Sequence, residues 1–164
     1  MAHLIAKYKS GKRIVEEKFI WKVAYQVLKG LSALHKQKIL HRDVKSANIF
    51  MTKCLSMIKL GDMNVSIVST NGMAKTQTGT PYYASPEVWN EKPYSSKCDI
   101  WSLGCVLYEL AALRPPFVSN DMKNLKRAII SGVYKRIPSN YSNELEDFIR
   151  MCMKVDPTNR PSAE

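Results

Sequence analysis

No apolar run in the 164-residue sequence approaches the length of about 20 residues that a membrane-spanning helix needs. The apolar core of residues 1–7 is too short for a secretory signal peptide. The chain also lacks internal repeats and low-complexity linkers, and its apolar fraction of 45% is ordinary for a globular protein. We therefore expect one domain in the cytoplasm, with the nucleus and the cytoskeleton as alternative locations and no contact with membranes.

Cysteine is also sparse, and its spacing excludes the common cross-linked classes. The chain contains no C-x-x-C pair, and most of its cysteines stand within apolar patterns. This arrangement predicts buried free thiols, with a metal site or a disulfide as the alternative. The four cysteines are Cys54, Cys98, Cys105 and Cys152.

The net charge of +11 at pH 7 is high, and it could suit acidic substrates, anionic partners or nucleic acid. The lysines are scattered through predicted helices, without interleaved aromatic residues and without a known nucleic-acid-binding motif. We therefore expect a solvated basic surface and no nucleic-acid binding.

Helical periodicity dominates the pattern of apolar residues. Apolar residues recur at helical spacing from about residue 16 to residue 35, and this stretch predicts a long helix. Further helices are expected at residues 4–9, 97–113, 121–131 and 142–153. Ser95 or Ser96 is expected to cap the helix at 97–113, and Ser142 the helix at 142–153. Two short apolar runs at residues 49–51 and 57–60 predict a β-hairpin. The expected fold class is mainly α with one short hairpin.

Residues 41–48 have the sequence HRDVKSAN and stand between the long helix and the first strand, which predicts a loop. Asp43 stands five residues before Asn48, and Asp62 follows fourteen residues later. A carboxylate can take a proton from an attacking hydroxyl, while amide and carboxylate oxygens can hold a hard cation. The alternative is a chance His-Arg-Asp in a surface loop. We favour the catalytic interpretation because Lys45, Asn48 and Asp62 all agree with it.

This segment resembles the catalytic loop of eukaryotic protein kinases, whose pattern is H-R-D-x-x-x-x-N. Lys45 is typical of the serine/threonine branch of that family. Residues 79–83, GTPYY, and residues 129–142 resemble the NIMA-related kinases. The resemblance covers essentially the whole chain. It implies the protein-kinase-like C-terminal lobe of an enzyme that transfers phosphate from Mg-ATP to protein serine or threonine.

The resemblance implies a role for each polar residue of the loop. Asp43 is expected to be the catalytic base, and Lys45 to contact the transferred phosphate of ATP. Asn48 and Asp62 are the expected ligands of magnesium, and His41 is expected to be structural. ATP and magnesium are thus the implied cofactors, and a protein substrate or partner protein is the implied binding partner.

Residues 63–87 resemble the activation segment of the kinase family. Arg42, beside the predicted base, is suited to bind a phosphate in this segment, and Thr76 is the expected phosphorylation site. Thr80 is implied to bond toward the catalytic Asp and Lys. Among structural residues, the resemblance implies that Glu87 pairs with Arg160. It also implies that Asp99 braces the catalytic loop.

Two features depart from the kinase pattern. Met63 and Asn64 replace the Phe and Gly that normally follow the metal-binding Asp; Met can fill an apolar gap, and Asn tolerates a left-handed conformation. In addition, no G-x-G-x-x-G loop and no Val-Ala-x-Lys strand precede the catalytic loop. Residues 1–164 are therefore expected to be the C-terminal-lobe portion of a kinase domain, without the N-terminal lobe and the last helix.

Since the absent parts hold ATP in this family, we expect the chain alone to have little or no activity. One alternative is a pseudokinase that acts as a protein-interaction module, and another is a truncated kinase fragment. An apolar face that includes Met63 and the hairpin around Phe50 is expected to be exposed.

Overall fold

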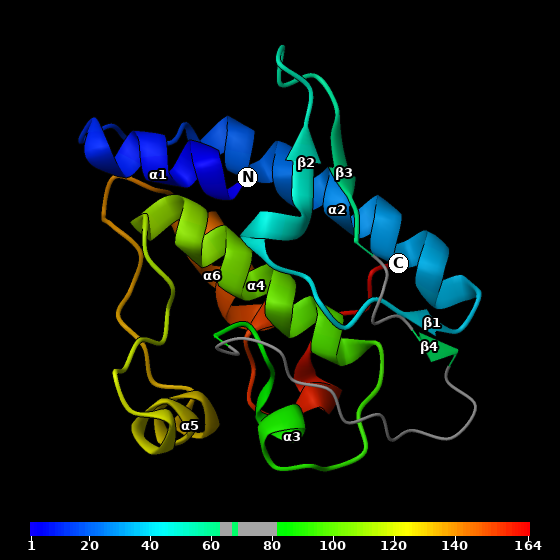
Figure 1. Cartoon of the computed structure of the whole chain (residues 1–164). Coiled ribbons are helices and arrows are strands. Elements are labelled where there is room, and N and C mark those ends of the chain that lie inside the picture. Colours follow the sequence, from blue (N-terminus) through cyan, green and yellow to red (C-terminus); the bar gives the residue numbers. More distant parts are fainter. Residues whose placement is uncertain (63–66, 69–81) are drawn as a thin grey trace.

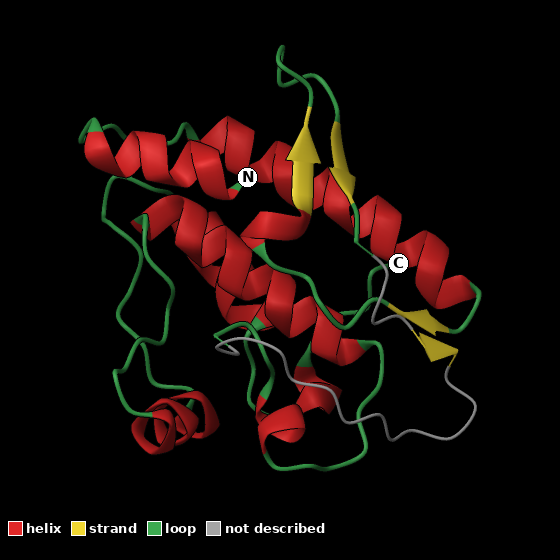
Figure 2. Ribbon diagram, viewed as in Figure 1, coloured by secondary structure: helices red, strands yellow, loops and turns green. Residues whose placement is uncertain are grey.

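The computed structural model describes residues 1–62, 67–68 and 82–164, and helices form most of this part of the chain (Figures 1 and 2). The helices are α1 (Ala2–Ser10), α2 (Glu17–Lys36), α3 (Pro86–Trp89), α4 (Lys97–Ala112), α5 (Met122–Ser131) and α6 (Asn143–Cys152), with 3-10 turns η1 (Ser46–Asn48) and η2 (Pro157–Asn159). The strands are β1 (Ile39–Leu40), β2 (Ile49–Met51), β3 (Ile58–Leu60) and β4 (Ile67–Val68). The expected mainly-α fold class is confirmed.

Helix α4 is the centre of the core, because every residue from Cys98 to Ala111 is buried. The spacing of Ile100, Leu103, Leu107 and Leu110 in the sequence predicted a single apolar face on this helix, and that prediction was too narrow. Helices α2 and α6 both pack on α4. The contact with α6 is close at Gly104, where a Cβ atom would lie 2.7 Å from Cγ of Met153 and 2.8 Å from Cβ of Cys152. Only a residue without a side chain lets the two helices approach this far.

Helix α2 carries the chain toward the predicted catalytic loop. Its apolar stripe is buried as expected, and its acidic first-turn residue Glu17 suits the positive end of the helix dipole. The Glu17 carboxylate also accepts hydrogen bonds from Nε1 of Trp21 at 3.1 Å and from the main-chain N of Ser142 at 2.9 Å. The hydroxyl of Ser142 donates to the same carboxylate, and this bond, followed by the main-chain bond of Ser142 and the bond of Trp21, lowers the pKa of Glu17. These bonds join the start of α2 to the start of α6. The buried stripe consists of Ile20, Val23, Ala24, Val27 and Leu31.

The predicted hairpin is present, since β2 and β3 pair antiparallel with Ile49 opposite Leu60. Gln26 of α2 holds the hairpin: its Oε1 accepts from the main-chain N of Ile58 at 2.6 Å, and its Nε2 donates to the oxygen of Ser56 at 3.3 Å. Phe50 is 56% exposed, in agreement with the expected exposed apolar hairpin.

A second antiparallel pair, β1 with β4, was not predicted from the sequence. Each of its strands has only two residues, which is too short for an alternating pattern to be recognised. The pair joins the chain just before the catalytic loop to the chain just after Asp62 (Figure 1).

The helix caps follow the sequence in part. Ser142 Oγ accepts from the main-chain N of Leu145 at 3.2 Å, as predicted, and Asp121 caps α5 in the same way. The prediction for α4 was wrong for Ser96, whose side chain makes no capping bond, whereas Ser95 Oγ accepts from the N of Lys97 at 3.4 Å.

Three of the four cysteines are buried free thiols as predicted, but Cys54 is exposed at the tip of the hairpin. The prediction was wrong there because the residues around Cys54 form a turn rather than part of the core. Within the described ranges, no helix is both long enough and apolar enough to cross a membrane.

Candidate active site

Asp43, Lys45 and Asn48 converge in the loop between β1 and β2. Oδ2 of Asp43 accepts hydrogen bonds from Nζ of Lys45 at 2.7 Å and from Nδ2 of Asn48 at 2.8 Å. Nδ2 of Asn48 also donates to the main-chain oxygen of Asp43 at 2.9 Å. The side chains of Lys45 and Asp43 are 34% and 30% exposed. The carboxylate is thus held on one side by the protein and accessible to a ligand on the other.

Asp99 joins this loop to the core. Its carboxylate accepts from the main-chain N of His41 at 3.0 Å and of Arg42 at 2.8 Å, and it lies 2.8 Å from Nε2 of His35. The side chain of Asp99 is fully buried in the first turn of α4, so its oxygens depend on these donors in place of water. The structure therefore brings Asp99 into the contact with the catalytic loop that the sequence led us to expect.

His41 and Asn48 join the loop to the predicted metal-ligand segment. Nδ1 of His41 accepts from the main-chain N of Asp43 at 3.3 Å, so Nε2 carries the ring proton and donates to the oxygen of Gly61 at 3.2 Å. The main-chain N of Gly61 donates to the oxygen of Asn48 at 2.9 Å. Asp62 follows directly and is exposed, in a left-handed conformation with φ of 62°. The two bonds of Gly61 place Asp62 next to the catalytic loop.

Phe50 lies beside this segment and was not recognised as a functional candidate from the sequence. Its ring packs on Gly61, where a Cβ atom would lie 2.9 Å from Cε2 of Phe50. The exposed ring therefore stands two residues after Asn48 in the sequence and packs on the residue directly before Asp62. The signal that could have found it is an aromatic residue on the solvent face of a strand two residues after a predicted metal ligand.

The expected pair of Glu87 and Arg160 is present and buried. All five N–H groups of the guanidinium donate: two reach the Glu87 oxygens at 2.7 and 2.8 Å, and three reach the main-chain oxygens of Lys154, Lys97 and Val155 at 2.7, 3.0 and 3.0 Å. Burial by itself would raise the pKa of Glu87, but the hydrogen bonds and charge of Arg160 outweigh burial and lower it. The pair links α3 to the end of the chain.

A further buried carboxylate, Glu109 of α4, was missed by the sequence analysis. Its Oε2 accepts from the hydroxyl of Tyr83 at 2.7 Å, and that hydroxyl lies 3.1 Å from Oγ of Ser46. Burial raises the pKa of both Glu109 and Tyr83, and in Tyr83 the neighbouring carboxylate raises it further. These bonds connect the catalytic loop to residues 82–87. A glutamate inside an otherwise apolar helix was the signal that could have found this contact.

The structure leaves part of the predicted site outside its described residues. Thr76, Thr80, Met63 and Asn64 all fall in the two gaps, 63–66 and 69–81. Their predicted roles remain predictions.

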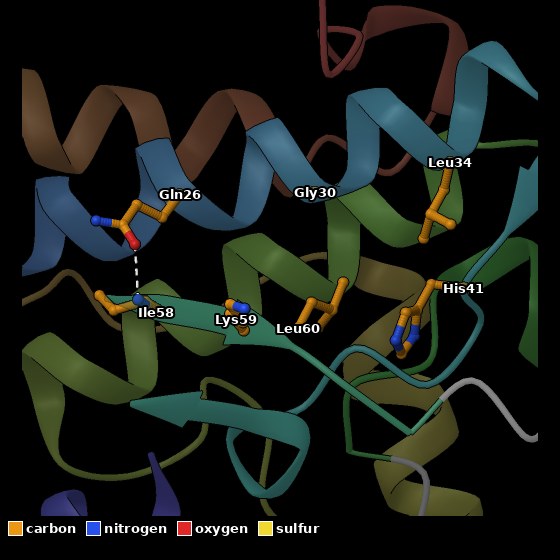
Figure 3. A pocket seen from close by; sticks show the side chains of 7 residues that line it. All are labelled: Gln26, Gly30, Leu34, His41, Ile58, Lys59 and Leu60. Carbon is orange, nitrogen blue, oxygen red and sulfur yellow. Dashed lines mark hydrogen bonds between the residues drawn. The ribbon is translucent and has the colours of Figure 1, made fainter. Parts of the chain in front are cut away.

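A pocket of about 250 Å³ lies between α2 and β3, behind the hairpin (Figure 3). His41 reaches its wall, but Asp43, Lys45 and Asn48 do not line it. The pocket is therefore separate from the convergent polar groups. Its lining consists of Gln26, Gly30, Leu34, His41, Ile58, Lys59 and Leu60.

The donor set fits magnesium better than a dedicated transition-metal site. No group of three or more His, Cys, Asp or Glu side chains suited to a metal occurs in the described part of the chain. Magnesium in phosphate-transferring sites needs only one or two protein oxygens, with phosphates and water completing its shell. Because Nδ2 of Asn48 donates to Asp43, its Oδ1 is the atom that could bind a metal, and a carboxylate oxygen of Asp62 is the predicted second ligand.

Comparison with known proteins agrees with this geometry. The family model described as Protein kinase domain matches residues 1–164. The chain is 42% identical over 160 residues to the serine/threonine-protein kinase Nek3 of Mus musculus, covering 96% of the chain and 31% of that protein. It is 47% identical over 139 residues to Nek1 of Mus musculus, covering 84% and 12%, and 39% identical over 171 residues to Nek2 of Homo sapiens, covering 100% and 38%.

The chain thus spans well under half the length of each of these relatives. The family match nevertheless includes all the described residues of the candidate site, from His41 in the catalytic loop to Arg160 in the buried ion pair. The chain belongs to the protein kinase domain family, in its NIMA-related branch of Nek serine/threonine kinases.

Proposed function

We propose that this chain carries the catalytic loop of an enzyme that transfers phosphate from Mg-ATP to serine or threonine of a protein substrate. The observation that carries the proposal is the shared Oδ2 of Asp43, which binds both Lys45 and Asn48. The bonds give the carboxylate a single orientation beside a positive charge. Phosphoryl transfer depends mainly on such positioning and on electrostatic stabilisation.

In this proposal Asp43 accepts the proton of the substrate hydroxyl as the oxygen attacks the γ-phosphorus. The bond from γ-phosphorus to the bridging oxygen of ADP breaks, and the proton ends on the Asp43 carboxylate. Lys45, whose Nζ lies 2.7 Å from Oδ2 of Asp43, would contact the oxygens of the transferred group. It would offset their negative charge during transfer.

Asn48 and Asp62 would hold magnesium, which neutralises the phosphate oxygens when bound. Phe50 is a candidate contact for the nucleobase, because its exposed ring lies against Gly61, directly before Asp62. Arg42 would bind a phosphate on Thr76, and Thr80 would bond toward Asp43 and Lys45. Support for Arg42 comes from its place in the loop directly before Asp43 and from its anchored main chain.

A protein-interaction module is the second candidate function. The observation in its favour is the apolar surface of the hairpin, where Phe50 and Met57 are 56% and 47% exposed. Exposed apolar groups of this size are common at contact sites between proteins. The same binding experiment tests both functions.

The test is calorimetric titration of the purified chain with Mg-ATP, repeated with EDTA and with Asp62→Ala. The matched control is Asp147→Ala, which removes an exposed aspartate of α6 far from the loop in sequence. We expect weak binding that requires magnesium, is lost in Asp62→Ala and is kept in Asp147→Ala. Binding that survives in Asp62→Ala would contradict the metal assignment. A folded chain without any magnesium-dependent binding would leave the interaction module as the better function.

A further inference from the structure

Helix α2 carries a row of lysines on its solvent-facing side. Positions 18, 22, 25, 29, 32 and 36 are separated by four and three residues in turn, so they share one face of the helix. This face lies opposite the buried stripe of α2. Three of its lysines are exposed, and Lys22 is half-buried. We call it the α2 basic face, and it consists of Lys18, Lys22, Tyr25, Lys29, Ser32 and Lys36.

No acidic residue balances these charges along the helix. The sequence contains no Asp or Glu between Glu17 and Asp43. In the part of the chain that the structure describes, the ion pairs include none of the four lysines. Like charges at positions i and i+4, such as Lys18 and Lys22, weaken a helix, whereas a Glu and a Lys at the same spacing stabilise it. The stability of α2 therefore does not explain a face whose charged residues are all lysines.

The residues between the lysines suit close contact with a partner. The Tyr25 side chain is 63% exposed, and Nζ of Lys29 lies 5.7 Å from the centre of its ring. Aromatic residues are enriched at contact sites between proteins. Ser32, between Lys29 and Lys36, has a small side chain that leaves room for a neighbouring element. The α2 basic face thus combines uniform charge with an exposed ring near its middle.

The spacing of the lysines selects the kind of anionic partner. Lys22, Lys29 and Lys36 are seven residues apart, so they repeat at about 10.5 Å along the helix axis. A partner helix that lies along α2 repeats its carboxylates at the same distance when it carries Glu or Asp at every seventh residue. An extended strand repeats the side chains of one face at about 6.8 Å, which does not match.

Nucleic acid fits this face less well than an acidic helix does. Proteins that bind single strands stack successive bases on several aromatic side chains. The α2 basic face has one aromatic residue, Tyr25, and Lys29 already lies over its ring.

We propose that the α2 basic face docks an acidic helix of a partner protein, in which Glu or Asp recurs at seven-residue spacing. None of the residues assigned to phosphate transfer belongs to this face, so docking does not depend on the proposed function. Exposed ion pairs are individually weak and are screened by salt. Binding of a single acidic helix should therefore be weak and should fall as the salt concentration rises.

The first test is titration of the ¹⁵N-labelled chain with a synthetic alanine-rich helical peptide, followed through the main-chain N–H signals. The probe peptide carries glutamates on one face at seven-residue spacing, and the control peptide has the same composition with the glutamates distributed around the helix. We expect the probe to shift the signals of residues 18–36 saturably, with a midpoint at least roughly threefold lower than that of the control peptide. Equal midpoints, or shifts confined to other parts of the chain, would overturn the proposal. Tighter binding of an oligonucleotide of the same net charge to this face would also overturn it.

Variants then separate the α2 basic face from the net charge of the chain. Lys22→Glu combined with Lys29→Glu should weaken binding of the probe more than about tenfold. A peptide with lysine in place of each glutamate should bind this double variant and not the wild type, a rescue that a loss of folding cannot produce. The control, Lys123→Glu combined with Arg127→Glu, changes the net charge equally at exposed residues of α5 and should leave the midpoint within about twofold. An equal loss in both double variants, or no rescue by the lysine peptide, would refute docking on α2.

Discussion

Removal of the Arg160 side chain should destabilise the fold more than removal of an exposed charged side chain does. The reason is that the Arg160 guanidinium donates hydrogen bonds to five acceptor oxygens. Arg160→Met leaves the buried Glu87 carboxylate without its cation and leaves three main-chain oxygens without these donors. Breaking one side of a buried pair costs about 3–5 kcal/mol. At about 2–4 °C per kcal/mol for a chain of this size, the unfolding temperature should fall by roughly 6–20 °C.

The partner substitution should be milder. In Glu87→Leu, Arg160 keeps its bonds to the oxygens of Lys154, Lys97 and Val155, so its charge remains partly solvated by the main chain. We therefore expect a loss near the lower end of the range, about 3 kcal/mol. The double variant should lose less than the sum of the two single variants, because neither charge is then left alone.

The matched control for this measurement is Arg150→Met. Arg150 pairs with Glu146 one helical turn away at 3.2 Å, but its side chain is 55% exposed. The Glu146 side chain is 5% exposed but keeps the main-chain N of Ile137 as a donor at 3.1 Å, so removal of Arg150 should cost about 1 kcal/mol or less. Thermal and urea unfolding followed by circular dichroism measure all four variants. The reasoning is refuted if Arg160→Met is no less stable than Arg150→Met.

The same pair should make stability depend on acid. Because Arg160 lowers the pKa of Glu87 below its ordinary value of 4.5, the ionised pair stabilises the fold above that pH. This contribution disappears as the pH falls through the lowered pKa of the folded state. The difference in stability between the wild type and Arg160→Met should therefore hold down to about pH 4.5 and shrink in the acid range below it. A difference that stays constant over this range would show that the charge of Glu87 is not involved.

Three further outcomes follow from local geometry. Gly104→Ala should destabilise the chain by about 1–3 kcal/mol in urea unfolding, since the new methyl group would clash with Cys152 and Met153. The control Gly30→Ala should be neutral or stabilising, because its Cβ would lie 3.9 Å from the nearest atom. Equal effects of the two substitutions would contradict the packing argument. Asp99→Asn should lower the free energy of unfolding by about 1–3 kcal/mol, because an amide offers one acceptor oxygen where the carboxylate offers two. Hydrogen exchange at the main-chain N–H groups of residues 41 and 42 should become faster. Unchanged exchange at both would exclude the bracing role. Hydrogen bonds from Ser56 and Thr52 lower the pKa of the exposed Cys54 thiol to about 7. A thiol reagent should therefore label one of the four cysteines of the native chain quickly, and the midpoint of the labelling rate should lie near pH 7. Fast labelling in Cys54→Ser would refute this.

Local patterns in the sequence predicted the parts of the structure that local interactions determine. The stripe of α2 and the cap at Ser142 depend on residues three or four apart, and their periodicity is visible in the sequence. The hairpin was predicted because two short apolar runs stand close together. The kinase motif further predicted the contact of Asp99 with the catalytic loop and the pair between Glu87 and Arg160.

Contacts between distant, chemically ordinary residues left no such signal. The Tyr83 hydroxyl meets Ser46 from 37 residues away and Glu109 from 26 residues away, and neither spacing follows a helical or strand period. The guanidinium carbon of Arg42 likewise lies 5.3 Å from the centre of the Tyr94 ring, although 52 residues separate the two in the sequence. Burial of α4 on all sides depends on its neighbours α2 and α6, which no property of its own sequence specifies.

The unpredicted pairing of β1 with β4 closes a loop of the chain that contains the catalytic loop, the hairpin and Asp62. Within this loop, the β2–β3 ladder and the bond from Gly61 to Asn48 form a second fastening. The tip of the hairpin, residues 52–57, lies outside both. A protease cut at the tip would break the covalent chain between Asn48 and Asp62, and an inserted tag would lengthen it. Neither change should move the two side chains apart in space. The two halves of the proposed metal site would remain aligned in a nicked protein as they are in the intact one.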